Sequence, residues 1–299
     1  MIYDLTTFEG NLKSVSSYLS LSEETVVGYI TNKGYEEVEV DSFLSDFKIE
    51  DSQLLNEDLW LTSLHVTNNN DKCKSIEKYG LVNLQETLTL DTPLSEYLKR
   101  YDISVNIEKK RIYNQGEIID ISKKYDGIER HEGRRREGLD RTVRKLFHDF
   151  QVNGFFYSEN VLNYGGGVHH RPEFLGDLAM LLGNRDIEYD WYRDIEYDWY
   201  RDVERIPYIL KFNAPISQFA NDTFDVSDEQ YNYLEKTDIE VMKRKKVIQK
   251  SLYYLKNKLD KGYISDFYSY LKFHASVPPS NIICIYTQDE YNKECEVHK

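Results

Sequence analysis

A histidine and a threonine stand two positions apart at the end of one strongly β-prone segment. Residues 59–67 read LWLTSLHVT and are followed by three asparagines. The segment is too short and too rich in β-formers for a helix, so we predict a strand. Alternate residues of a strand face the same side, which places Ser63, His65 and Thr67 together. A ligand hydroxyl at the strand end could therefore reach both His65 and Thr67.

A short helix and a glycine follow this strand. We predict a helix over residues 71–79 that ends at Gly80, because glycine readily takes the left-handed conformation at that position. Leu81 can then pack back. Much later, residues 277–282 read VPPSNI and lead into a predicted strand over 282–286.

These two segments resemble motif blocks of the ADP-ribosyltransferase superfamily, which includes DNA-modifying toxin-like members and RNA 2′-phosphotransferases. In those families a strand ending in His-x-Thr precedes a short helix and a Gly-Leu pair, as His65-Val66-Thr67 and Gly80-Leu81 do here. The VPPSNI segment is similar to the closing strand of many such domains. The two blocks bracket residues 59–286 and match over a small part of that span.

The resemblance implies an α+β fold with a mixed or antiparallel sheet core and inserted helices, and NAD as a substrate. His65 would bond the adenosine ribose of NAD, and Thr67 would help to orient it. These transferases usually carry a Glu before the late strand, where it stabilises the oxocarbenium-like transition state. This chain has His274 there and no Glu. Glu173 is the nearest substitute, so the resemblance implies Glu173 or His274 as the catalytic residue.

Structural explanations compete with these assignments. A lone strand-end histidine such as His65 is more often a side chain satisfied by the protein than a ligand contact. Glu173 follows Pro172 at the start of a predicted helix, where the helix dipole favours a carboxylate without any catalysis. Both explanations stay open at the level of sequence.

A basic cluster lies between residues 130 and 145, where seven Arg and Lys residues stand against three acids. Arginine binds phosphate bidentately, so Arg134, Arg141 and Arg144 are candidates for the pyrophosphate of a dinucleotide or for a nucleic acid. A solvated helix face is the structural alternative. His169 and His170 are adjacent and lack partners at a diagnostic spacing, so we predict no metal site.

Composition restricts the class of protein. The net charge of −14 disfavours general polyanion binding, and three cysteines without a CxxC spacing indicate a reducing compartment. No run approaches the ~18 apolar residues of a membrane-spanning helix. We therefore expect a cytoplasmic protein that does not bind membranes.

The pattern along the chain predicts an N-terminal helical region over residues 1–57 and an α+β catalytic domain over 58–299. Helix signals include the Thr92-Pro93 cap, an apolar stripe over 139–150, a helix from Pro172 to Gly183 and a long helix around 248–259. Strand signals fall at 103–119, as a hairpin or meander, and at 206–212.

The octet RDIEYDWY occurs twice, at residues 185–192 and 193–200, and a degraded third copy follows. This period is too short for a solenoid, so we expect a local duplication in a tolerant surface segment. An aromatic and acidic recognition surface is the alternative.

Three classes of function follow. The leading hypothesis is an NAD-consuming ADP-ribosyltransferase, a bacterial toxin or anti-phage effector with a nucleic-acid or protein acceptor and an antitoxin or phage protein as partner. The second is a nucleic-acid-binding protein or nuclease that uses the arginine cluster and His169-His170. The third is a non-catalytic interaction protein that presents its tyrosines and repeats.

Overall fold

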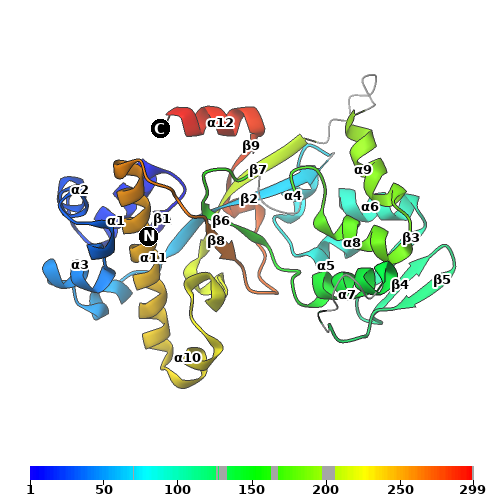
Figure 1. The fold of residues 1–299 in the computed structure, drawn as a ribbon, viewed down its shortest axis with the longest axis horizontal. Helices are drawn as coiled ribbons and strands as arrows, with labels where there is room; N and C mark the ends of the chain where they lie inside the picture. Colours follow the sequence, from blue (N-terminus) through cyan, green and yellow to red (C-terminus); the bar gives the residue numbers. More distant parts are fainter. Residues whose placement is uncertain (70, 126, 128–132, 163–167, 197–205, 298–299) are drawn as a thin grey trace.

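A computed structural model describes the chain except for residues 70, 126, 128–132, 163–167, 197–205 and 298–299 (Figure 1). The described residues form a mixed α+β fold with a six-stranded and a three-stranded sheet. The large sheet is antiparallel apart from one parallel pair, between its first two strands. The α+β class with an antiparallel core, predicted from the sequence, is confirmed.

The large sheet has the strand order β8-β6-β2-β7-β9, and β1 also pairs with β2. Its strands are β1 (Ile2–Asp4), β2 (Trp60–Asn69), β6 (Asn153–Tyr157), β7 (Ile206–Pro215), β8 (Phe267–Tyr270) and β9 (Ile282–Thr287). The ladder between β2 and β7 is unbroken from Trp60, opposite Pro215, to Asn69, opposite Ile206. This ladder fixes which residues of β2 face each side, because the side chains of a strand alternate.

The N-terminal region packs against the large sheet and one long helix. It contains α1 (Phe8–Tyr18), α2 (Glu23–Thr31) and α3 (Val40–Asp46), and the long helix is α11 (Lys236–Asp260). Thr7 and Ser22 cap α1 and α2 through their side chains, as serine and threonine do at helix starts. Residues 1–57 contribute β1 to the sheet and share one hydrophobic core with it, including Tyr3 and Phe212.

A second core lies to the other side of the sheet (Figure 1). We call the elements around it the side lobe: α5 (Leu84–Thr89), α6 (Pro93–Arg100), β3 (Ile103–Asn106), β4 (Arg111–Asn114), β5 (Glu117–Asp120), α7 (Arg134–Phe147), α8 (Glu173–Leu182) and α9 (Asp186–Glu196). Thr92 caps α6, and Gly183 ends α8 with a left-handed φ of 64°, as the sequence predicts. Strands β3 to β5 form the predicted meander.

The remaining α-helices of the described residues are α4 (Lys74–Tyr79), α10 (Asp228–Tyr233) and α12 (Gln288–Val297), and short 3-10 helices lie at Tyr35–Glu37, Asp51–Leu55, Ile216–Gln218, Asn221–Phe224 and Pro279–Asn281. Helix α4 follows β2 directly, as predicted. Among the residues that the structure describes, no helix is long and apolar enough to cross a membrane.

The first RDIEYDWY copy is not a surface segment. It forms most of α9, where Ile187 and Trp191 are each 1 % exposed and belong to the core of the side lobe. The expectation of a tolerant surface duplication is therefore wrong for this copy, because the apolar residues of an eight-residue segment can still supply one buried helix face. Residues 197–200 of the second copy, and the degraded third copy, lie outside the described residues.

Candidate functional site

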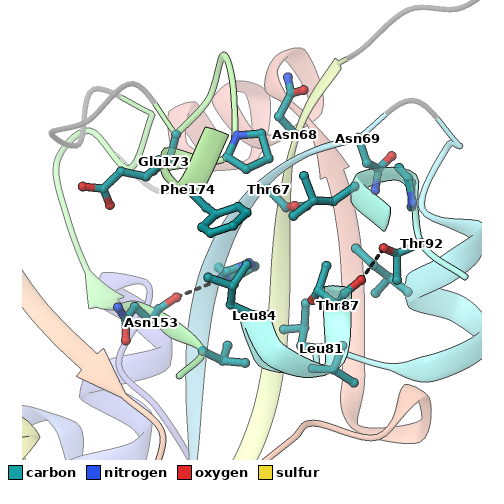
Figure 2. Close-up of a pocket in the computed structure, with 18 of the residues that line it drawn as sticks. Thr67, Asn68, Asn69, Leu81, Leu84, Thr87, Thr92, Asn153, Glu173 and Phe174 are labelled. Atoms are coloured by element: carbon teal, nitrogen blue, oxygen red, sulfur yellow. Dashed lines mark hydrogen bonds between the residues drawn. The ribbon is translucent and has the colours of Figure 1, made fainter. Parts of the chain in front are cut away.

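A cavity of about 290 Å³ lies between the end of β2 and the side lobe. Its lining comes from β2, from the stretch that runs from α4 to the start of α6, from the end of α7 and the residues after it, from the start of α8 and the residues before it, and from Trp191 of α9. Figure 2 shows Glu173 and Phe174 on one side, Thr87 and Thr92 on the opposite side, and Thr67 between them. The cavity thus brings together His65, Thr67 and Glu173, three of the candidate site residues that the sequence suggested.

His65 is half-buried in the sheet wall of this cavity. Its Nδ1 lies 2.7 Å from the backbone oxygen of Asn153, on the neighbouring strand. Burial lowers the pKa of His65 below its ordinary value, against the opposing effect of that hydrogen bond. The ring is therefore neutral at pH 7, with Nδ1 as the donor and Nε2 left as an acceptor. A neutral imidazole of this kind can accept a hydrogen bond from a ligand hydroxyl.

The asparagines that end β2 hold the upper part of the cavity in place. Asn68 accepts a 3.0 Å hydrogen bond from Nε1 of Trp191 and donates another to the backbone oxygen of His169. Asn69 bonds both the backbone N–H and the sulfur of Cys73. The sequence suggested only that these asparagines end the strand. Asn68 also joins β2 to α9 of the side lobe, and Asn69 joins β2 to the start of α4.

The base of the cavity is the point where the two motif segments meet. Leu81 and Val277 exchange two backbone hydrogen bonds, of 2.8 and 2.9 Å. Gly80 has a φ of 79°, and a Cβ there would stand 2.0 Å from the backbone oxygen of Val277. Only glycine fits such a conformation and such a close approach. The Gly-Leu pair and the VPPSNI segment therefore form one structural junction, although about 200 residues separate them.

The side-lobe wall carries the charges. Nζ of Lys145 lies 2.6 Å from a carboxylate oxygen of Asp149 and 2.6 Å from one of Glu173. Burial alone would lower the pKa of Lys145, but hydrogen bonds to these carboxylates raise it above its ordinary value. Lys145 thus stays protonated. Glu173 is the more open of the pair, with 46 % of its side chain exposed against 15 % for Lys145.

Arg171 is the second cation in the cavity wall. Its Nε donates to Glu188 at 2.7 Å, and its guanidinium packs on Gly176, where a Cβ would lie 2.8 Å from Nη2. Its Nη1 is buried and has no hydrogen-bond partner among the residues that the structure describes. An unpaired guanidinium nitrogen beside a cavity can bind an anionic ligand group. Nothing in the local sequence distinguished Arg171 from the other arginines.

The other predicted residues do not line the cavity. Arg141 is 2.7 Å from Glu137, Arg144 is 3.6 Å from Asp149, and Arg134 is exposed at the start of α7. His274 is also exposed, with its ring 5.9 Å from that of Phe150, which does line the cavity. Lys145 and Arg171 supply the cations there. The number of basic residues between 130 and 145 did not indicate which of them would face the cavity, and Arg171 lies outside that stretch.

A cluster of three or more metal-ligating side chains is not found in the described part of the chain. His169 and His170 lie ring against ring, with centroids 3.8 Å apart. Comparisons of the chain with protein-family models, with curated proteins and with solved structures give no match. The function is therefore argued from the cavity and its residues.

Proposed function

We propose that the chain is an NAD-consuming enzyme of the ADP-ribosyltransferase type. The observation that carries the proposal is the shared cavity: His65 and Thr67 of β2 face the same space as Glu173 of α8. The meeting of Gly80-Leu81 with Val277 at its base supports the same conclusion. The second segment of the resemblance thus pairs with Leu81, which lines the cavity.

The cavity favours a nucleoside as the buried part of the ligand. Ligand pockets generally have volumes of roughly 300–1,000 Å³, and this one is at the lower end, at about 290 Å³. One half of NAD would occupy it, and the remainder would lie along the mouth. The acceptor Nε2 of His65 suits a ribose hydroxyl, and the buried Nη1 of Arg171 suits a pyrophosphate oxygen.

The reaction breaks the bond between nicotinamide and C1′ of its ribose. The bonding electron pair leaves with nicotinamide, which departs neutral, and positive charge develops on the ribose. A carboxylate beside that ribose stabilises the charge, which is the role we assign to Glu173. The acceptor atom then bonds C1′ and releases its proton to solvent or to a carboxylate. Lys145 keeps Asp149 as a second partner, so Glu173 can turn toward the substrate without leaving Lys145 unpaired.

Substitution of Glu173 by glutamine tests this role. We expect turnover, measured as nicotinamide release from labelled NAD with a cell lysate as acceptor, to fall about 10²–10³-fold with little change in NAD binding. Glu117→Gln is the matched control, because Glu117 pairs with Arg135 of α7 away from the cavity.

Two other outcomes separate the alternatives. If Glu173 only stabilises its helix, Glu173→Gln should lower the free energy of unfolding by about 0.3–1 kcal/mol and leave turnover unchanged. If turnover is lost in His274→Ala but not in Glu173→Gln, His274 and not Glu173 is the residue that acts at the reacting ribose.

A further inference from the structure

A lysine lies buried in α11 beside a second cavity. Lys243 is 5 % exposed, and no described carboxylate lies within ion-pair distance of its Nζ, which stands 5.5 Å from the centre of the Phe224 ring. Glu240, three residues earlier on the same helix, is bound to Arg244 at 2.9 Å. Burial, and then the positive charge of Lys272, lower the pKa of Lys243. An unpaired buried ammonium is costly, so an anion that reaches it gains a strong interaction.

Lys243 opens onto a second cavity, of about 500 Å³. Lys272 lines the same cavity, and the one carboxylate among the lining residues, Asp222, is exposed. Two lysines against one solvated acid make this space locally positive in a chain whose net charge is −14. The cavity is therefore suited to an anionic group.

Two amide oxygens at this cavity are suited to a ligand with N–H or O–H donors. Oε1 of Gln151 and Oδ1 of Asn221 are buried, and neither has a hydrogen-bond partner in the described part of the chain. Buried acceptors without a partner are uncommon, because each one loses its hydrogen bonds to water. A ligand that carries donors beside its anionic group would satisfy them.

Two aromatic side chains at the same cavity are unusually exposed. Tyr231 is 52 % exposed and Phe273 is 46 % exposed. Phe273 is held in place by stacking on Phe150, with ring centroids 5.0 Å apart and an angle of 15° between the rings. A fixed, exposed ring of this kind is a platform on which a flat heterocycle can stack.

We infer that this second cavity binds a nucleotide, with its phosphate at Lys243 and Lys272 and its base against the exposed rings. The base supplies the N–H donors that Gln151 and Asn221 lack. Gln151 lines both cavities, so the nucleotide lies next to the cavity of His65. The inference does not depend on NAD turnover. The source of the nucleotide is either a free mononucleotide or a single-stranded nucleic acid, which share this chemistry.

Binding by the full chain tests the inference. The probes are a fluorescent single-stranded oligonucleotide of thymidines, followed by anisotropy, and adenosine monophosphate, followed by calorimetry. We expect Lys243→Met to lower the affinity for the probe that binds roughly 10- to 100-fold, which is the scale of one charge-assisted hydrogen bond in a buried site. Lys250→Met is the matched control, because Lys250 lies on α11 with Nζ 5.2 Å from the Phe267 ring but does not line the cavity. The affinity of the Lys250→Met protein for the same probe should stay within about twofold of the wild type, because the substitution removes no contact to the ligand.

The results separate the sources and can overturn the inference. Binding of the oligonucleotide alone identifies single-stranded nucleic acid as the ligand, and binding of the mononucleotide alone identifies a free nucleotide. Lys272→Met, on an exposed residue, provides a second variant if Lys243→Met does not fold, and it should also weaken binding. Failure of the wild type to bind either probe, or equal losses in Lys243→Met and Lys250→Met, would overturn the inference.

Discussion

The sheet and the side lobe contribute different chemistry to the cavity between them. The sheet wall, from His65 to Asn69, is neutral and offers hydrogen bonds. The side-lobe wall carries Lys145, Arg171 and Glu173 with their ionic partners. Groups that orient a ligand are thus separated from groups that can stabilise charge.

The two walls also differ in how they are held. His65 is positioned by a backbone ladder whose strands, β2 and β7, lie about 150 residues apart in the sequence. The charged residues are positioned by ion pairs within the side lobe, a nearly contiguous part of the chain. The sheet wall should therefore depend on long-range packing, whereas the side-lobe wall should respond to changes in charge. The following changes test this difference.

Trp191→Ala should have the largest effect on stability. Trp191 is 1 % exposed, packs edge-on against Tyr97 and donates to Asn68 of the sheet. Its removal leaves a large void and takes away one hydrogen bond to Asn68, so we expect a loss of about 3–5 kcal/mol in the free energy of unfolding, measured with denaturant. Tyr189→Ala, on an exposed position of the same helix, should cost well below half of that. Equal losses would mean that α9 does not join the two walls.

Gly80→Ala should be the next most damaging change. The new Cβ would meet the Val277 oxygen at 2.0 Å, in a conformation that non-glycine residues rarely adopt. We expect a loss on the order of 3 kcal/mol from strain and displaced backbone. Gly116→Ala is the control, because Gly116 also has a positive φ, of 87°, but open space around its Cβ position. If thermal unfolding shows both variants equally destabilised, the junction at Val277 does not constrain the fold.

Asp177→Asn should show the charge sensitivity of the side-lobe wall. Burial, and then the charge of Glu173, raise the pKa of Asp177 from 3.8 to about 6. Between about pH 4 and pH 6 the folded state keeps a proton on Asp177 that the unfolded chain has already released. The free energy of unfolding therefore falls as the pH rises through this range. Above pH 6 we expect the asparagine variant to be more stable by on the order of 2 kcal/mol, with little difference below pH 4. A difference that does not vary with pH would contradict this explanation.

Much of the fold could be predicted where local chemistry decides the structure. Thr92-Pro93 and Gly183 mark helix ends by their own conformational preferences, and the alternation of β2 placed His65 and Thr67 on one face. Strands β1, β6 and β8 were not predicted, because each is only three to five residues long and is defined by distant partners.

The candidate site could be predicted only in part, for a related reason. A motif indicates which residues end a strand or a turn, and this was sufficient for His65, Thr67 and the Gly80 junction. The faces of α7 and α8 that turn toward β2 depend on how the side lobe packs, so Lys145 and Arg171 could not be chosen over Arg134, Arg141 and Arg144. The burial of Trp191 likewise depends on its contact with Asn68.

The most direct test of the proposed function is nicotinamide release from NAD by purified His65→Ala protein beside the wild type. Nδ1 of His65 bonds one backbone oxygen and the ring lines the cavity, so its removal should abolish turnover while cooperative unfolding is retained. His148→Ala, at an exposed position outside the cavity, should turn over NAD like the wild type. Unchanged turnover in a folded His65→Ala protein, or no nicotinamide release by the wild type with any acceptor, would contradict the account.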